Sequence, residues 1–174
     1  LEARYRVPVF VENVVKLSAI GEKQYGEGKI YKDIVFIEIS DGIGAGIILD
    51  DHLVRGYYGS AGEIGFSIIG TENLGFVAAN KGFLEQTASY ESIEEIAREE
   101  LMSGRWPRMA ERIGGEPAEL TPACVCEKAY EGDPVALRIV GRIAAALSVE
   151  IVNLILLLNP QLVVIGGDFC GLPR

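Results

Sequence analysis

Basic side chains are scarce in this sequence, and histidine is almost absent. Sixteen lysines and arginines stand against 25 aspartates and glutamates, so the formal net charge of the 174 residues is −9. Proteins that bind nucleic acids directly need a broad basic surface for the phosphate backbone. We therefore expect this chain to make no direct contact with DNA or RNA. The single histidine, His52, falls in a predicted hairpin turn, and we interpret it as a surface residue.

Cysteine is also sparse, with Cys124, Cys126 and Cys170 as the three examples. An odd number of cysteines is typical of a reducing compartment rather than of a disulfide framework. Cys124 and Cys126 are separated by one residue, and no second pair of metal ligands lies nearby in the sequence. We interpret them as half-buried helix thiols rather than as a metal site.

Long apolar runs are missing as well. The longest run, residues 151–160, contains Asn153 and ends at Pro160, so it is shorter than the roughly 20 residues that cross a bilayer. We interpret it as the end of a buried helix. The first ten residues lack the apolar segment and the cleavage pattern of a signal peptide. The sequence therefore predicts no membrane contact and a cytoplasmic location.

The chain does contain enough apolar side chains for a core, since 49% of its residues are hydrophobic. Alternating, β-rich segments predict strands, with a hairpin turn at Asp50 and Asp51. Helical spacing predicts helices, one of which starts with a capping box at Ser92. The strands are expected at 7–12, 33–40, 43–50, 52–56 and 161–167, and the helices at 13–28, 92–104, 121–132 and 133–159. This order predicts an α/β domain in which helices flank a mixed sheet.

The arrangement of these elements bears on domain organisation. The chain opens inside a strand–helix unit and stops just after a strand, so we expect residues 1–174 to form a single region of a longer protein. Between Tyr57 and Gly75 glycines recur without a regular apolar period. Loops of that length in a compact domain are usually functional.

Two glycine-rich segments are candidates for ligand binding. Residues 39–51, ISDGIGAGIILDD, have the composition of a phosphate loop, but Asp41 would place a carboxylate against an anion. The second segment holds Glu63 between glycines. Together with Asn13 and Glu85 it would offer several acceptors and an amide, a set that suits neighbouring sugar hydroxyls. Composition alone also allows Glu63 to be a helix cap or a solvated acid.

Five segments then occur in the order and spacing of a known family: EN after PVFV, DGIGAGII, RGYYGSAGEIGF, KGFLE and LNPQLVVIGG. Over roughly residues 7–168 the chain resembles the ROK family of repressors, open reading frames and sugar kinases, within the actin-like ATPase superfamily. The resemblance implies a two-lobed, RNase H-like fold with a sugar between the lobes. It also implies that Asn13, Glu63 and Glu85 contact that sugar.

The position of the catalytic base departs from the kinase pattern. ROK kinases carry Asn-Asp-x-Asn, whose Asp takes the proton from the sugar hydroxyl; here Asn13 matches the first Asn, Val14 replaces the Asp and Lys16 replaces the second Asn. Valine cannot accept a proton, and a positioned base contributes on the order of 10²–10⁴ in rate. Glu12, next to it in a predicted strand, should point to the opposite face. The resemblance therefore implies no catalytic residue at this position.

The phosphate loop departs too. Kinases of the family resemble Gly-Thr-Gly-Ile-Gly where this chain has Ser40, Asp41, Gly42, Ile43 and Gly44, so an anion replaces a hydroxyl donor. Like charges 4 Å apart near a protein surface repel by about 4 kcal/mol. We interpret Asp41, Gly42 and Gly44 as a degenerate phosphate loop and expect no bound ATP. On the adenosine side, the resemblance places a glycine turn at Gly166 and Gly167.

The zinc motif of the family is missing as well. Where many members have a histidine and a Cys-x-Cys-Gly-x-x-Gly-Cys run, this chain has Phe66, Phe76, Ala78 and Phe83. Tetrahedral zinc needs four good donors. We therefore expect no zinc, and we expect apolar packing at that place.

These departures favour one function over two others. The first hypothesis is the effector-binding and dimerisation part of a sugar-responsive ROK repressor, without kinase activity, whose helix-turn-helix lies outside this chain and whose functional unit is a homodimer. The second is an ATP-dependent sugar kinase, glucokinase-like or specific for an N-acetylhexosamine, with a relocated base. The third is a structural dimerisation module that binds neither sugar nor ATP, which Phe66 at the position of a sugar-contacting histidine favours slightly.

Overall fold

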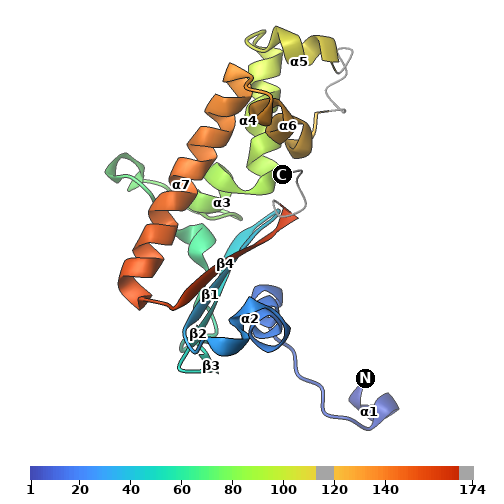
Figure 1. The fold of residues 1–174 in the computed structure, drawn as a ribbon, viewed down its shortest axis with the longest axis vertical. Coiled ribbons are helices and arrows are strands. Elements are labelled where there is room, and N and C mark those ends of the chain that lie inside the picture. The colour runs from blue at the N-terminus through green and yellow to red at the C-terminus, as the bar shows by residue number, and fades with distance from the viewer. Residues whose placement is uncertain (113–119, 169–174) are drawn as a thin grey trace.

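The computed structural model describes residues 1–112 and 120–168. Its centre is a four-stranded mixed sheet in the order β3-β2-β1-β4, shown in Figure 1. Strands β1 (Ile34–Ile39), β2 (Ile43–Leu49) and β3 (His52–Leu53) form an antiparallel meander, and β4 (Leu162–Gly167) pairs with β1 in parallel. The predicted α/β class with a mixed sheet and flanking helices is confirmed.

The turn between β2 and β3 has the geometry that its two aspartates allow. Asp50 and Asp51 have φ values of 49° and 65°, so both are left-handed, as in a two-residue hairpin turn that matches the strand twist. The carboxylate of Asp33 accepts the backbone N–H of Asp50 at 2.8 Å. The turn lies where the sequence placed it, although β3 is shorter than the predicted 52–56.

The two faces of the sheet carry different helices. Helix α2 (Val14–Tyr25) packs on one face through Ala19 against Ile34, Phe36 and Ile48. A methyl group at Gly46 would stand 2.3 Å from Cβ of Ala19, so this glycine allows the close approach of helix and strand. The next residues along β1 point to the other face, where they join the larger core.

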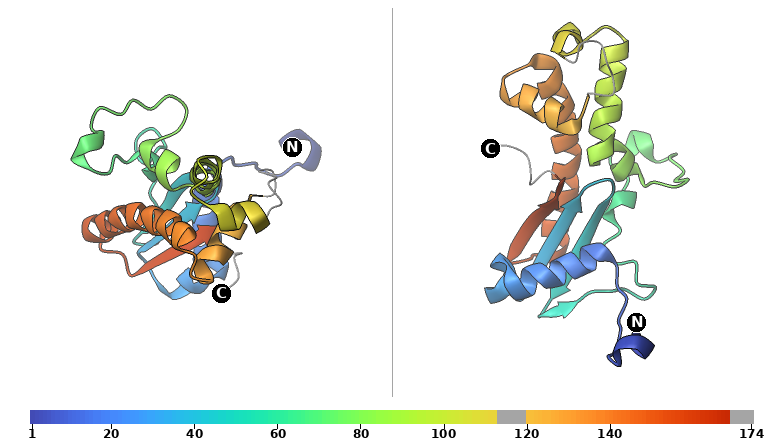
Figure 2. Two further views of the ribbon diagram at one scale, coloured as in Figure 1. Left: turned by 90° about the horizontal axis from the view of Figure 1, so that it is seen from above. Right: turned by 90° about the vertical axis from the view of Figure 1, so that its right-hand side faces the viewer.

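The remaining helices build that larger core. They are α3 (Phe83–Ala88), α4 (Tyr90–Met102), α5 (Pro107–Arg112), α6 (Pro122–Tyr130) and α7 (Pro134–Leu158). Figures 1 and 2 show α4, α5 and α6 beyond one end of the sheet, around one half of α7. Short 3-10 turns complete the chain at Glu27–Ile30, Ile64–Phe66 and Thr71–Asn73. The loop that carries Glu63 thus runs between the sheet and α3.

The first twelve residues differ from the structure that their sequence predicts. Residues 7–12 were expected to form a strand, but they are irregular, and Phe10 and Val11 are 90% and 94% exposed. Alternation alone does not make a strand, because the ladder needs a partner, and none lies beside this segment within the described part of the chain. Before it stands a short helix, α1 (Glu2–Tyr5), that the sequence pattern did not predict.

The start of α4 also differs from its prediction. The helix begins at Tyr90 rather than Ser92, and its cap is Ser89, whose hydroxyl accepts the backbone N–H of Ser92 at 3.3 Å. The hydroxyl of Ser92 instead donates to the carbonyl of Ser89 at 2.7 Å. The predicted capping box was therefore wrong by one turn, because the preceding helix α3 brings the chain to Ser89 already folded.

Helix α7 lies where the sequence predicted a helix, at 133–159, but its last turns are largely exposed and not buried as expected. Its 25 residues have a mean hydropathy of 1.9 in their most apolar window, so length and composition alone would let it cross a membrane. A core helix passes the same test, and Ala136, Ile139, Ile143 and Leu154 of α7 pack into the large core. Its other side exposes apolar residues, with Leu156 78% and Leu157 80% exposed.

Asp133 provides a test of how α7 begins. Its buried carboxylate accepts the backbone N–H groups of Val135 at 2.9 Å and Ala136 at 3.1 Å. Burial raises the pKa of Asp133, but the N–H groups of Ala136 and Val135, together with the Trp106 side chain and the charge of Arg108, outweigh burial, and the pKa lies below its ordinary value. Because the pKa of Asp133 is lowered by folding, its charged carboxylate stabilises the fold at any pH above the pKa that it has in the unfolded chain. This stabilisation is lost as the pH falls through the pKa of Asp133 in the folded chain.

We expect Asp133→Ala to lower the free energy of unfolding by about 1–2 kcal/mol at pH 7. Urea denaturation at pH 7 and at stepwise lower pH measures the effect. The difference from the unmodified protein should shrink below pH 4, while Asp133→Asn, a cap without a charge, should show little pH dependence of its own. If the free energies of unfolding of Asp133→Ala and the unmodified protein differed by the same amount at all pH values, the charged Asp133 cap would be contradicted.

Candidate functional site

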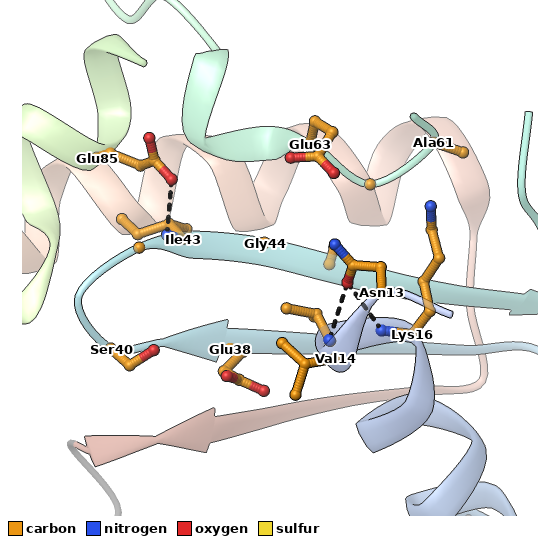
Figure 3. Close-up of a pocket in the computed structure, with 14 residues that line it drawn as sticks. Asn13, Val14, Lys16, Glu38, Ser40, Ile43, Gly44, Ala61, Glu63 and Glu85 are labelled. Carbon is orange, nitrogen blue, oxygen red and sulfur yellow. Dashed lines mark hydrogen bonds between the residues drawn. The ribbon is translucent and has the colours of Figure 1, made fainter. Parts of the chain in front are cut away.

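One pocket gathers the three residues that the resemblance assigns to sugar binding. It has a volume of about 230 Å³ and is lined by the start of α2, the β1–β2 hairpin, residues 61–63 and α3 (Figure 3). Asn13, Glu63 and Glu85, which are distant in sequence, all line it. The volume is below that of drug-sized ligand sites and suits a ligand the size of one monosaccharide.

Asn13 is the N-cap of α2. Its side-chain oxygen accepts the backbone N–H of Val15 at 2.9 Å and of Lys16 at 3.3 Å. These two bonds fix the orientation of the amide group. The amide nitrogen has no hydrogen-bond partner in the described part of the chain, so both of its N–H donors are available to a ligand.

Val14 occupies the first helical position after this cap. Its side chain is 65% exposed and lines the pocket, where it brings no proton acceptor. Glu12 does not replace it, because its carboxylate bonds Arg55 at 2.7 Å and the N–H of Asn13 at 3.1 Å. Those two contacts hold the pKa of Glu12 below its ordinary value, with the Asn13 bond as the larger cause.

Glu38 is a pocket residue that sequence reasoning missed. It projects from β1 toward the same hollow as Val14 in Figure 3, and its carboxylate accepts the Ser18 hydroxyl at 3.2 Å. The signal was present in the sequence. Alternation along β1 places Glu38 on the face of Ile34 and Phe36, toward α2, where a charged side chain in an apolar strand calls for an explanation.

Glu85 is held against the glycine turn by two backbone groups. Its carboxylate accepts the N–H of Gly82 at 2.9 Å, which fixes the start of α3, and the N–H of Ile43 at 3.3 Å. A methyl group at Gly42 would lie 3.0 Å from the Glu85 carboxylate, and one at Gly65 would lie 2.5 Å from its Cγ. Glycines therefore make room for this acid in the pocket wall.

The backbone next to Glu63 is fixed by a hydrogen bond to β2, while the Glu63 carboxylate makes no bond within the described residues. The Gly62 carbonyl accepts the N–H of Ala45 at 2.7 Å, which ties the loop to β2, and Gly62 has a φ of 90°. The Glu63 carboxylate has no hydrogen bond or ion pair among the described residues, and its side chain is exposed. Its acceptors are open to a ligand.

The predicted phosphate loop divides between two hollows. Gly42 and Gly44 line the pocket, and a methyl group at Gly44 would lie 3.1 Å from a methyl carbon of Val15. Asp41 does not line the pocket. It is exposed and borders a second hollow together with Lys81, Tyr90, Glu91, Glu94 and Pro122.

Gly166 and Gly167 were predicted as a glycine turn on the adenosine side, and their contact with adenosine stays a prediction. They are the last two residues of β4, paired with Glu38 and Ile39 of β1, and neither lines the pocket. Gly167 has a φ of 97°, and a methyl group there would stand 2.2 Å from the Ile39 carbonyl oxygen. A methyl group at Gly166 would instead stand 2.4 Å from the ring of Phe36, so the two glycines allow a close approach to β1 that sequence spacing alone could not reveal.

The positions of the family's zinc motif hold packed aromatic rings. Phe76 and Phe83 meet edge to face with centroids 5.4 Å apart, while Phe66 is half exposed beside Glu63. Within residues 1–112 and 120–168, no three side chains of His, Cys, Asp or Glu converge as metal ligands. That this chain binds no zinc at these positions stays a prediction. The apolar packing expected there is present for Phe76 and Phe83.

The histidine and cysteines lie outside the pocket. His52 is exposed in the hairpin, where its Nδ1 is 2.6 Å from the carbonyl of Asp50. Cys124 and Cys126 are partly buried thiols on α6, as predicted, and burial raises the pKa of Cys126. Cys170 lies outside the described residues.

Two contacts fasten the loop of residues 55–63 to the start of α2. The ammonium of Lys16, whose residue is 2% exposed, donates to the carbonyl of Gly59. Arg55 pairs with Glu12 at 2.7 Å. The loop that presents Glu63 is thus positioned relative to Asn13 by charged groups that do not themselves belong to the predicted sugar contacts.

We expect Lys16→Met to loosen this loop. A hydrogen bond from a charged donor contributes about 1.5–3 kcal/mol, so amide hydrogen exchange at residues 56–63 should rise by about tenfold or more. Lys23→Met is the matched control, because Lys23 lies on the same helix but bonds Tyr31 and Asp51. Equal exchange of the loop in both variants would contradict the role of Lys16.

Comparison with known proteins gives two kinds of relative. The chain is 30% identical to the xylose repressor of Caldicellulosiruptor bescii over 96% of this chain and 41% of that protein. It is 33% identical to the glucokinase of Halalkalibacterium halodurans, over 96% of this chain and 51% of the enzyme. The chain thus spans about half the length of these relatives.

The fold comparison agrees. The crystal structure of a ROK family glucokinase from Streptomyces griseus, in complex with glucose and AMPPNP, matches with a TM-score of 0.80 and 28% identity. The match covers 97% of this chain and 55% of that one. The fold is therefore that of the actin-like ATPase lobe which the resemblance implied. A ROK family sequence profile matches residues 1–172, and the chain belongs to the ROK family.

Proposed function

We propose that this chain is the effector-binding part of a sugar-responsive ROK transcriptional regulator, and that it binds its sugar without phosphorylating it. The observation that carries the proposal is the pocket itself, in which unpaired polar groups meet a valine at the position of the family's base. Asn13 offers two free N–H donors and Glu63 a free carboxylate, while Val14 offers no acceptor. The chain therefore keeps groups that would bind a sugar and has no proton acceptor at the position of the family's base.

A sugar fits the chemistry of the free groups. Each hydroxyl needs a donor and an acceptor, and the pocket provides amide, hydroxyl and carboxylate groups from Asn13, Ser40, Glu38 and Glu63. Relatives named for xylose and a relative crystallised with glucose make these two sugars the first probes. We propose that DNA is contacted through a helix-turn-helix outside this chain, because a net charge of −9 disfavours direct contact.

The signal would pass through a homodimer in the cytoplasm. One side of α7 exposes Val149, Val152, Leu156 and Leu157, an apolar surface that a second copy could cover. A sugar changes such an assembly only if it binds one arrangement of the subunits better than the other. Sedimentation analysis with and without sugar tests this part of the proposal, and a monomer at all concentrations would contradict it.

A sugar kinase is the second candidate, and one observation favours it. Glu38 brings a carboxylate into the pocket beside Val14, where a relocated base would have to stand. Against this, its carboxylate already bonds the Ser18 hydroxyl, and the glycine turn is bordered by Asp41 instead of a hydroxyl donor. If Glu38 were a base, ATP-dependent sugar turnover would be measurable and Glu38→Gln would abolish it.

Thermal-shift screening distinguishes the candidates. Hexoses, pentoses, N-acetylhexosamines and ATP with magnesium are added separately to the protein. Stabilisation by a sugar, but not by ATP, is expected for the regulator. Stabilisation by both, with sugar phosphate formed, would establish the kinase, and stabilisation by neither would favour a purely structural dimerisation module.

A further inference from the structure

We propose that Glu12 couples occupation of the pocket to the position of residues 1–11, the segment that leads into α2. The coupling rests on the proposed function, because it needs a ligand that contacts Asn13 and Glu63 together. It adds a route by which such a ligand would act on another part of the molecule. It is carried by the contacts of residues 1–11 and by the two bonds of the Glu12 carboxylate.

Residues 1–11 have few attachments to the rest of the chain. Helix α1 buries no residue, and Figures 1 and 2 show it apart from the sheet and from the other helices. Within the described residues, the hydrogen bonds of this segment have both ends inside it, as in the bond from the N–H of Val9 to the Glu2 carboxylate at 2.9 Å. The position of the segment is therefore determined where it joins the folded body, at Glu12.

The Glu12 carboxylate bonds to both walls of the pocket. One oxygen accepts the backbone N–H of Asn13 at 3.1 Å, at the start of α2. The other accepts the Nε–H of Arg55 at 2.7 Å, at the start of the loop that presents Glu63. We call these two bonds the Glu12 bridge. The side chains of Glu12 and Arg55 are 21% and 58% exposed, so water can replace the ion pair and a ligand can shift its population.

Arg55 is connected to Glu63 through the backbone of the loop. Its carbonyl accepts the N–H of Ala61 at 3.0 Å, which closes the loop two residues before Glu63. The residue before Arg55 is fixed, because the N–H of Val54 donates to β2 at 2.8 Å. A shift of the pocket wall at Ala61 therefore acts on Arg55 and not on the strand.

A ligand that contacts Asn13 and Glu63 together favours one separation of the two pocket walls. The Glu12 bridge spans the same two walls. Ligand and bridge therefore stabilise each other when both favour the same separation, and each strengthens the other by the same factor. For an exposed ion pair this factor is about two- to fivefold. The bound ligand would thus reduce the motion of residues 1–11 at the point where they leave the body.

Nuclear magnetic resonance of the isotope-labelled chain tests the coupling. The heteronuclear Overhauser effect of the amides of residues 9–11 is measured without sugar, with saturating xylose and with saturating glucose. We expect a sugar that binds to increase the order of these amides in the unmodified protein and in Arg55→Lys, which keeps the charge. In Arg55→Met we expect little change of their order, and sugar affinity lower by about two- to fivefold.

Arg98→Met is the matched control, because it removes an exposed ion pair with Glu94 on α4 and leaves the Glu12 bridge in place. In the unmodified protein high salt should reduce the response of residues 9–11, since it screens the exposed pair. An equal response in Arg55→Met and the unmodified protein would overturn the coupling, as would a sugar that binds by calorimetric titration without changing these amides. If neither sugar binds, the proposed function is contradicted, and the coupling with it.

Discussion

Gly62→Ala is expected to displace the loop that carries Glu63 and to reduce sugar affinity by at least about 100-fold. The backbone at Gly62 has a φ of 90°, and a methyl group there would stand 1.8 Å from the carbonyl oxygen of Ala45. Strand β2 cannot yield, because Ala45 is buried in the core and its N–H bonds the Gly62 carbonyl. The free energy of unfolding should fall by about 3 kcal/mol or more.

Gly59→Ala is the matched control for this variant. Its φ of 76° is equally unfavourable for alanine, but no atom lies within 4 Å of the added methyl group. It should cost about 1–2 kcal/mol and leave most of the sugar affinity. Calorimetric titration and chemical denaturation of both variants measure the difference. Similar losses in the two would mean that backbone strain, rather than the clash with β2, determines the effect.

Glu63→Gln is expected to weaken sugar binding by about 10- to 100-fold while leaving the free energy of unfolding within about 0.5 kcal/mol. The reason is that the Glu63 carboxylate has no partner within residues 1–112 and 120–168, so we expect its bonds to form with the ligand. Glu85 makes the opposite case. Its carboxylate bonds Gly82 and Ile43, and Glu85→Gln should lower both stability and affinity.

The control for Glu63→Gln is Glu72→Gln, in the exposed turn that follows the pocket loop. Glucose or xylose is titrated into the unmodified protein, Glu63→Gln and Glu72→Gln under the same conditions, and the three affinities are compared. A loss of stability in Glu63→Gln, or unchanged sugar affinity, would show that Glu63 acts as part of the fold and not as a ligand contact.

Much of the fold follows from local patterns in the sequence. The hairpin at Asp50 and Asp51, strand β1 and helix α7 are each determined by neighbouring residues, and each lies close to where the sequence predicted it. Residues 7–12 show the limit of this reasoning. They are rich in β-branched residues, as β1 is, but strand formation depends on a pairing partner, which local pattern does not contain.

Three residues of the candidate site could be predicted from the sequence, but the hydrogen bonds that hold them in place could not. Family spacing brought together Asn13, Glu63 and Glu85, and all three line one pocket. The strand pattern places Glu38 on the face toward α2, but it does not show that this face opens into the pocket. The bond between Glu85 and the N–H of Ile43 joins residues 42 positions apart, and only the folded chain places them in contact.

The central claim is that this pocket binds a sugar and does not phosphorylate it. The most direct measurement is calorimetric titration of glucose and xylose in the presence of ATP and magnesium, followed by phosphorus NMR of the same sample. We predict saturable binding of at least one sugar and no sugar phosphate after prolonged incubation. Formation of sugar phosphate, lost in Glu38→Gln, would contradict the claim and establish a kinase.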